Sequence, residues 1–390
     1  MLTSFKELMD LTVSSRKPAF EDTLLRWLCL NNVPQMGFIR LRKSAQAMGC
    51  SLLDLTSLDA KTLASLSWDD TQIAALNSTS KSVQQHYKAT CNWLNANENH
   101  HFIGLDSNDY PALLKSITRP PLFLYIAGNK THLTDTQIAF VGTRKPSIYA
   151  TQTCFDLIQE LSINTNVSTV SGLALGIDAA CHKASVLHNV PTIGVLACGI
   201  DIVYPKRHQK LYKEVEEAGA LISEFLPGAK PTPTMFPRRN RIITGLSLGT
   251  VVVEAKIKSG SMVSAKYAIE QNKEVFAVPN NINNPNAEGC HWLIKQGAKL
   301  TEHVQDIIEE LPSIALPLVE TTNTEKMKKN SQQHFTSDPL LDSVSYSATS
   351  VDLIAKRTGM SLSDVLTKLL EYEMRGLVAS TAEGYVKLRA

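Results

Sequence analysis

The stretch STVSGLALGIDAACHKASVLHNVPTIGVL, residues 168–196, has the pattern of a strand, a helix and a second strand. The short apolar runs at 168–170 and 192–196 contain β-branched residues, which favour strands. Between them, residues 176–188 begin at a glycine and have apolar side chains at helical spacing. This order is typical of a parallel crossover unit, so the stretch predicts part of a parallel sheet.

The same alternation extends from residue 138 to residue 311. The predicted strands are 138–141, 168–170, 192–196, 221–225, 250–253 and 275–278. The predicted helices are 149–161, 176–188, 207–218, 240–247, 261–271 and 290–296. Because the strands are almost continuously apolar, both faces of their sheet must be covered by crossover helices. We therefore predict an α/β fold class with an extended Rossmann-like parallel sheet core, in a domain of residues 106–311.

Three further segments flank this core. Residues 1–105 have helical apolar spacing, and VPQMG at 33–37 resembles the turn of a helix-hairpin-helix; we predict a helical domain of the SAM or helix-hairpin-helix kind. An ordinary turn in a helical bundle is the alternative. Residues 312–345 are weakly apolar and are predicted to be a flexible linker. Residues 346–390 contain two helical runs and then two short apolar runs, which predict a winged-helix-like domain.

Composition limits the possible partners. The formal charge is only +2 over 390 residues, so any surface that binds nucleic acid must be local. The seven cysteines lack the spacing of a zinc or redox motif, which favours reduced thiols and a cytoplasmic location. No apolar run approaches the roughly 18 residues of a membrane span, and the first residues lack the apolar region of a secretory signal. We expect a cytoplasmic protein without a membrane partner.

Candidate phosphate ligands follow the predicted strands, at the edge where parallel α/β sheets bind their ligands. Glycine lets backbone amides approach an anion, a hydroxyl group donates to it, and a guanidinium group binds it through two nitrogens. The residues of these three kinds that follow the first, second and fifth strands are Gly142, Thr143, Arg144, Ser171, Gly172, Gly260 and Ser261.

Two basic segments add to this set. YPKR at 204–207 follows the third strand, and FPRRNR at 236–241 precedes a helix. Both segments add positive charge, and FPRRNR combines cations that bind phosphate with an aromatic ring on which a base can stack. The residues predicted to bind nucleic acid in these segments are Lys206, Arg238, Asn240 and Arg241. The alternative is that Arg239 is merely solvated and that Arg241 pairs with a carboxylate such as Glu254.

Familiar catalytic and cofactor motifs are missing from the sequence. Pro146 follows the first strand where a dinucleotide-binding helix would begin, and no Walker, G-x-S-x-G or H-E-x-x-H motif occurs. Asp178 and His182 lie four residues apart but lack a third metal ligand. We therefore expect a binding protein with no catalytic residue, no metal and no cofactor.

Many short segments, in order along the chain, resemble the DprA family (DNA-processing protein A, also called Smf). The segments are 109–111, 120–125, 141–144, 171–178, 204–206, 224–227, 236–247, 253–255, 259–261, 276–279 and 289–290. Departures from the usual family pattern occur at Thr143, at Asn280 and at Val263-Ser264, and none removes an expected phosphate ligand.

The resemblance implies a function without catalysis. The Rossmann-like core would bind single-stranded DNA, form a homodimer around residues 291–300, and deliver the strand to the recombinase RecA in natural transformation. The key phosphate contacts of the family correspond to Arg144 and Lys206, with Asn240 and its neighbouring arginines in the same groove.

Two other function classes remain open. A Rossmann-like nucleotide N-glycosidase would use Gly249-Thr250 and Glu254, although a second glycine is missing before them. A winged-helix transcription factor would read DNA with residues 362–373, but Asp364, Glu371 and Glu373 in that segment repel phosphate and favour a protein contact.

Overall fold

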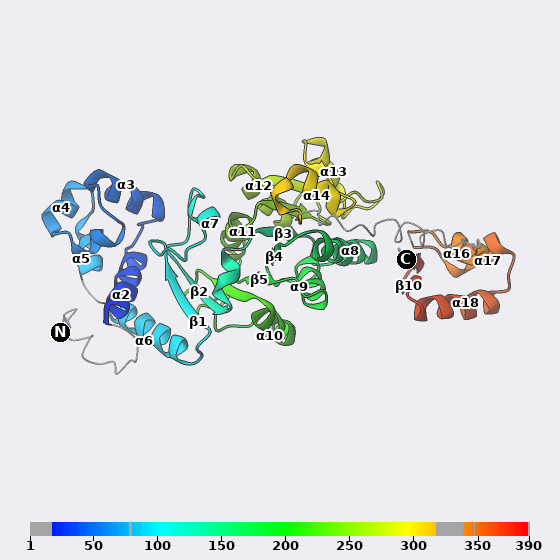
Figure 1. Cartoon of the computed structure of the whole chain (residues 1–390), viewed down its shortest axis with the longest axis horizontal. Coiled ribbons are helices and arrows are strands. Elements are labelled where there is room, and N and C mark those ends of the chain that lie inside the picture. Colours follow the sequence, from blue (N-terminus) through cyan, green and yellow to red (C-terminus); the bar gives the residue numbers. More distant parts are fainter. Residues whose placement is uncertain (1–17, 78–79, 317–337, 347, 389–390) are drawn as a thin grey trace.

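The computed structural model describes residues 18–77, 80–316, 338–346 and 348–388 (Figure 1). Its centre is a nine-stranded sheet with the order β1-β2-β6-β5-β4-β3-β7-β8-β9. The strands are β1 (His100–Gly104), β2 (Phe123–Gly128), β3 (Gln137–Val141), β4 (Ser168–Ser171), β5 (Thr192–Val195), β6 (Ala220–Ser223), β7 (Gly249–Val252), β8 (Glu274–Ala277) and β9 (Lys299–Leu300). The strands from β6 to β9 in this order are parallel, which confirms the predicted α/β class.

Helices cover both faces of the parallel part. They are α8 (Ile148–Asn164), α9 (Ile177–Leu187), α10 (Gln209–Ala218), α11 (Met235–Leu246), α12 (Gly260–Glu270), α13 (Glu288–Lys295) and α14 (Val304–Glu310). Phe140 packs with α8, α9 and α14, whereas its neighbour Val141 packs with α11 and α12. Successive strand residues point to opposite faces, so the near-continuous apolar runs supply both cores.

The sheet also contains strands that the sequence did not predict. β1 and β2 pair antiparallel with each other, and β2 pairs antiparallel with β6, so the sheet is mixed. β1 begins at His100, inside the segment predicted to be helical, because Phe102 and Ile103 are buried against the sheet. The sheet therefore begins before residue 106, the boundary that the sequence predicted.

The N-terminal segment is helical, as expected. Its helices are α2 (Pro18–Asn32), α3 (Phe38–Met48), α4 (Ala60–Ser65), α5 (Asp70–Asn77) and α6 (Lys81–Asn95), with a 3₁₀ turn η1 (Leu53–Ser57). Trp27 of α2 is fully buried, and a Cβ atom on Gly104 of β1 would lie 2.1 Å from its Nε1 atom. The helical segment thus shares a core with the edge of the sheet. No helix in residues 18–316 or in the described C-terminal part combines the length and apolarity that a membrane span requires.

Short elements complete the core, and the bounds of η4 and of helix α11 differ from the predicted ones. They are α7 (Ala112–Lys115) and the 3₁₀ turns η2 (Lys130–Leu133), η3 (Lys206–His208) and η4 (Pro312–Ile314). Ile314 of η4 is buried with the helices of one sheet face, so the core continues beyond residue 311. α11 begins at Met235, five residues before its predicted start, because proline is tolerated in the first turn of a helix and Pro237 lies there.

The C-terminal domain has its own core (Figure 1). Its elements are α16 (Pro339–Ser343), α17 (Val351–Thr358), α18 (Leu362–Met374), β10 (Val378–Thr381) and β11 (Gly384–Lys387). The last two pair as an antiparallel wing. The sequence assigned residues 338–345 to the linker, but Leu340 and Val344 are buried in this core and Asp338 caps α16. Residues 317–337, the rest of the predicted linker, lie outside the described residues.

Candidate nucleic-acid interface

The strand order places a ligand site between β3 and β7. The chain proceeds from β3 through β4 and β5 to β6 in one direction, and from β7 through β8 to β9 in the other. The carboxyl ends of β3 and β7 therefore border a crevice at the switch in strand order, where open α/β sheets bind ligands. A hollow of about 270 Å³ lies there. The predicted residues that line it are Gly142, Thr143, Arg144, Asn240, Gly260 and Ser261.

The loop after β3 is held by its own backbone and by the start of α9. The Thr143 amide donates to the Glu254 carbonyl oxygen at 2.7 Å, and the Thr143 carbonyl accepts from the Ile177 amide at 3.2 Å. Gly176 has φ +83°, and a Cβ atom there would lie 2.2 Å from the Thr143 oxygen. Arg144 and Lys145 are the exposed residues of this loop. The fixed backbone thus directs one free guanidinium group to the rim.

Arg239 forms the floor of the hollow and was not among the predicted ligands. Only 3% of it is exposed, and its guanidinium group donates to the carbonyl oxygens of Gly172 and Val195. A Cβ atom on Gly172 would lie 2.2 Å from the Arg239 Nη1 atom, so this position accepts only glycine without a shift. The alternative that Arg239 is solvated is wrong. Arg239 links the ends of β4 and β5 through these two hydrogen bonds and places a buried positive charge under the site.

Two buried groups beside Arg239 respond to this charge. Burial raises the pKa of Asp178, and the charge of Arg239 opposes the rise. Burial lowers the pKa of His182 to about 3, and Arg239 adds to that shift, so the imidazole is neutral at physiological pH. His182 Nδ1 lies 2.8 Å from the Thr192 hydroxyl. Within the described residues, no group of three or more His, Cys, Asp or Glu side chains could hold a metal ion.

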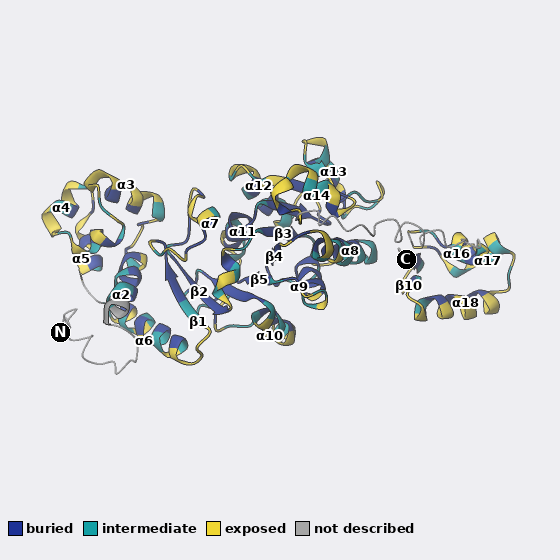
Figure 2. Ribbon diagram, viewed as in Figure 1, coloured by how far each residue is buried: buried dark blue, intermediate teal, exposed yellow. Residues whose placement is uncertain are grey.

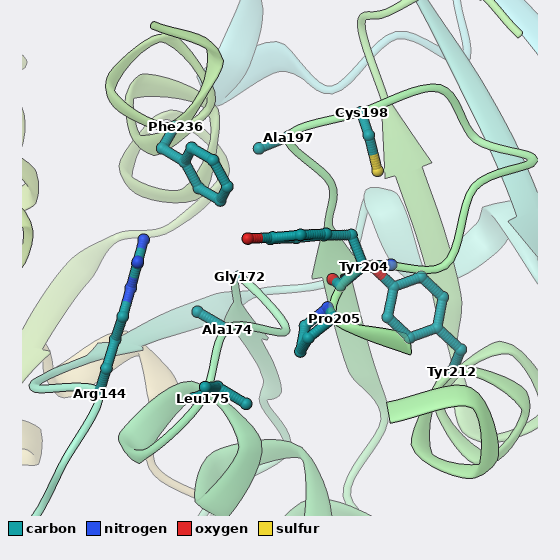
Figure 3. A pocket seen from close by; sticks show the side chains of 10 residues that line it. All are labelled: Arg144, Gly172, Ala174, Leu175, Ala197, Cys198, Tyr204, Pro205, Tyr212 and Phe236. Atoms are coloured by element: carbon teal, nitrogen blue, oxygen red, sulfur yellow. Dashed lines mark hydrogen bonds between the residues drawn. The ribbon is translucent and has the colours of Figure 1, made fainter. Parts of the chain in front are cut away.

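An aromatic and cationic cluster extends the hollow along the edge (Figure 3). The Arg144 guanidinium carbon lies 5.2 Å from the centre of the Phe236 ring. The Tyr204 ring meets Phe236 edge-on, with ring centres 5.8 Å apart. Tyr204 is 45% exposed, so ring surface is available to a ligand. Exposed rings beside a cation are what a single-stranded nucleic acid requires, because bases stack on rings and phosphates bind cations.

The opposite side of the hollow is the N-terminus of α12. Its N-cap residue Ser259 makes no side-chain cap, and its hydroxyl oxygen is buried without a partner among the described residues. The first amides of a helix have no acceptor within the helix, and they carry the positive end of its dipole. Gly260 adds open space, since a Cβ atom there would meet nothing within 4 Å. Asn240 Nδ2 fixes this turn by donating to the Gly260 carbonyl at 3.3 Å.

The remaining predicted residues differ in their availability. Lys206 is exposed in η3, two residues after Tyr204. Arg238 is also exposed but lies 3.3 Å from Glu224. The Ser171 hydroxyl is buried and donates to the Phe140 carbonyl at 2.7 Å, so it stabilises the sheet.

Arg241 is held by the protein itself. Its side chain is 13% exposed, pairs with Glu224 and donates to the Arg119 carbonyl at 2.6 Å. The alternative of an ion pair at Arg241 is thus correct in kind, although the partner is Glu224 rather than Glu254. A cation that is paired and mostly buried has little capacity left for phosphate.

The Glu254 carboxylate, which an N-glycosidase site would use, is engaged by neighbouring protein groups. Its buried carboxylate accepts hydrogen bonds from the Ser147 amide and hydroxyl, at 2.9 and 2.7 Å, and from Asn280 and Asn284. Gly249 and Thr250 begin β7 at its amino end, whereas Glu254 follows its carboxyl end. Gly249 and Thr250 thus lie at the other end of β7 from Glu254, which disfavours a ligand site formed by all three residues.

Comparisons with known proteins agree with this architecture. The family model described as DNA recombination-mediator protein A matches residues 101–312, and the DprA winged helix domain matches residues 335–384. Protein Smf of Escherichia coli (strain K12) is 42% identical over 293 residues, which are 75% of this chain and 78% of that protein. DNA processing protein DprA of Bacillus subtilis (strain 168) is 42% identical over 211 residues, 54% of this chain and 71% of its own. The X-ray structure of DNA processing protein A from Streptococcus pneumoniae covers 76% of this chain and 97% of its own, with 29% identity and a TM-score of 0.59.

Proposed function

The chain belongs to the DNA recombination-mediator protein A (DprA/Smf) family, and we propose that it binds single-stranded DNA along the edge formed by the carboxyl ends of β3, β4, β5 and β7. The observation that carries the proposal is the arrangement of Arg144, Phe236 and Tyr204 beside the open N-terminus of α12. These groups bind features that every strand has, its phosphates and the faces of its bases.

In this proposal each group has a separate task. Arg144 and Lys206 bind phosphates, the amides of Gly260 and Ser261 bind another phosphate, and bases stack on Phe236 and Tyr204. At Gly142, Thr143 and Gly172 the DNA strand can approach the protein backbone closely. Arg239 is a positioning residue, because its nitrogens are engaged by carbonyl oxygens inside the fold. Bases are not read at their edges, so binding has little sequence selectivity.

The test compares Arg144→Ala and Lys206→Ala with Lys266→Ala by fluorescence anisotropy on a labelled single-stranded oligonucleotide. Lys266 is an exposed cation of α12 that pairs with Glu270, away from the helix N-terminus. Each site variant is expected to lose about tenfold or more in affinity, because a charge-assisted contact to phosphate contributes about 1.5–3 kcal/mol. The slope of log affinity against log salt should fall by about 0.7 per lost contact. Wild-type affinity in both site variants would refute this interface.

We further propose that the bound strand is passed to a RecA-type recombinase during natural transformation, in the cytoplasm. The family description as a recombination mediator supports this step. Such a mediator must hold the strand without cutting it, and the occupied carboxylate of Glu254 is consistent with a protein that does no chemistry. The test is recombinase filament formation on a strand coated with single-stranded DNA-binding protein: the wild type should accelerate it and Arg144→Ala should not.

A homodimer through the end of the core completes the proposal. Trp292 of α13 and Leu300 of β9 are 44% and 41% exposed at the last strand of the sheet. Large exposed apolar side chains beside an edge strand favour association, since both the side chains and the unpaired strand edge would be covered. Trp292→Glu should lower the mass in sedimentation equilibrium if this surface is the dimer interface.

A further inference from the structure

Glu254 places a carboxylate inside the fold, next to the loop that carries Arg144. Figure 2 colours β3, β4 and β5 as buried, and Glu254, which follows β7 in the same sheet, is 0% exposed. Hydrogen bonds from uncharged groups in the described part of the chain hold this carboxylate. A buried charge is costly, and a negative charge beside a phosphate site repels phosphate. The carboxylate therefore contributes something other than its charge.

Glu254 holds both ends of the loop that carries the cations. Its backbone carbonyl accepts from the Thr143 amide at 2.7 Å. Its side chain accepts from the Ser147 amide and hydroxyl at 2.9 and 2.7 Å. Arg144 and Lys145, the exposed residues of the loop, lie between these two attachment points. One residue therefore limits the positions that both cations can adopt.

The donors around the carboxylate have fixed orientations. The Ser147 hydroxyl accepts from the Ala150 amide at 3.1 Å as the N-cap of α8, so its own proton is available to Glu254. On the other side, the Nδ2 atoms of Asn280 and Asn284 donate to Glu254 at 3.3 and 3.0 Å. Their Oδ1 atoms accept from backbone amides of the same loop at 2.7 and 2.9 Å, so neither side-chain amide turns over without losing a hydrogen bond.

Four donors converge on the side chain of Glu254, and this pattern requires an oxygen at both of its terminal positions. Glutamine has nearly the same shape but carries an NH₂ group in place of one oxygen. If that group faces the Ser147 amide, the amide loses its acceptor. If the group is turned round, it faces the Nδ2 atoms of the two asparagines. Either orientation leaves a donor without a partner, so the attachment of the loop is weakened.

We propose that Glu254 is a positioning residue for DNA binding, which holds Arg144 and Lys145 where they meet the phosphates of the strand. The inference rests on the proposed function, because it requires a strand at this loop. A loop that is already ordered loses less conformational entropy when the strand binds. The sign of the effect of Glu254→Gln is therefore informative. Removal of a negative charge by itself would strengthen binding, whereas loss of the fixed loop weakens it.

The test is a double-mutant cycle, measured at low salt by fluorescence anisotropy on a labelled single-stranded oligonucleotide. Glu254→Gln is made in the wild type and in the chain with Arg144→Ala/Lys145→Ala. It should weaken binding about fivefold in the wild type. It should change binding less than about 1.5-fold in the chain without the two cations, because no cation is left to position. The same loss in both chains would reveal a merely architectural residue and overturn the proposal, as would wild-type or tighter binding by Glu254→Gln alone.

Glu160→Gln is the matched control for the substitution. The Glu160 carboxylate also holds a backbone amide, that of Val304 at 2.7 Å, but it lies near the other end of α8. This variant should bind DNA as the wild type does. Asn284→Ala is the second variant, which removes a donor behind Glu254 without touching the loop. It should weaken binding about twofold in the wild type and not in the chain without the two cations, and it decides the question if circular dichroism shows that Glu254→Gln is unfolded.

The parent chain of the cycle separates the two proposals. If Arg144→Ala/Lys145→Ala binds DNA as the wild type does, the interface itself is wrong and the positioning role falls with it. If that chain binds weakly but Glu254→Gln weakens it by a further factor of about five, the interface stands and only the positioning role is overturned.

Discussion

Gly176 adopts a backbone conformation that is available almost only to glycine, with φ +83° and ψ −128°. A Cβ atom there would also lie 2.2 Å from the Thr143 oxygen, which is backbone and cannot turn away. Gly176→Ala should therefore destabilise the protein by about 3 kcal/mol, measured by urea unfolding. Gly228→Ala is the matched control, because Gly228 has φ +84° but nothing within 4 Å of the added atom. It should lose only about 1 kcal/mol. Equal losses would mean that the contact with Thr143 is unimportant.

His182 predicts a pH dependence of stability. Its pKa is lowered to about 3 in the folded protein from an ordinary value of 6.5, so only the unfolded chain binds its proton between these values. Stability from this residue is complete above pH 6.5 and is lost as the pH falls towards 3. The loss at pH 5 should be about 2 kcal/mol. His182→Asn, which keeps a polar group near Thr192, should remove this component of the acid sensitivity.

The measurement is the free energy of unfolding between pH 5 and pH 8 for the wild type, His182→Asn and His188→Asn. His188 is the C-cap of the same helix and is only partly buried, so its variant controls for the loss of a histidine at α9. An unchanged slope in His182→Asn would show that another group causes the acid sensitivity.

At the scale of an element, the N-terminus of α12 offers a test of amide binding without loss of charge. Gly260→Pro removes one amide proton at the first position of the helix, where proline is favoured, and Ser259 already has the extended conformation that precedes proline. Affinity for single-stranded DNA should fall about fivefold, the equivalent of about 1 kcal/mol, while stability is kept. Gly260→Ala retains the amide and should bind as the wild type does. If both variants bind normally, α12 does not hold a phosphate.

The sequence predicted the parallel strands well, because a strand buried on both faces has a near-continuous apolar run. It did not predict β1, whose sequence begins with two histidines and whose strand character depends on pairing with β2. Short edge strands have a weaker apolar pattern because one side is open. The helical N-terminal region therefore appeared to extend to residue 105, five residues beyond the start of β1.

The sequence predicted which residues lie at the candidate site more accurately than it predicted what each side chain does there. Arg144, Asn240 and Gly260 meet in one hollow because Arg144 follows β3, Asn240 lies in the second turn of α11 and Gly260 begins α12 at the same sheet edge. The roles of Arg239 and Arg241 depend on distant partners, the Val195 carbonyl and Glu224, which no local pattern indicates. The direction of each arginine side chain in FPRRNR depends on its position in helix α11. That helix begins at Met235, earlier than the sequence predicted.

At the scale of the whole molecule, the proposed DNA site and the C-terminal domain lie on parts of the chain with separate cores. Truncation after residue 316 should therefore leave affinity for single-stranded DNA within about twofold of the wild type, with the same salt slope. The cut belongs after residue 316 rather than 311, because Ile314 is buried and the Leu316 amide donates to the Asn164 carbonyl at 3.0 Å. A chain ending at 311 should lose stability, since it exposes the apolar surface that Ile314 covers.

The chain ending at residue 316 also tests whether the C-terminal winged helix binds DNA. It is compared with the full chain by anisotropy on single-stranded and on duplex oligonucleotides, and by sedimentation equilibrium. If the C-terminal domain binds DNA, the chain ending at 316 should lose affinity for the duplex and keep the oligomeric state of the full chain. If the C-terminal domain does not bind DNA, the same chain should keep its affinity for both oligonucleotides. Asp364, Glu371 and Glu373 of α18 favour the second result, because phosphate affinity requires positive charge at the contact.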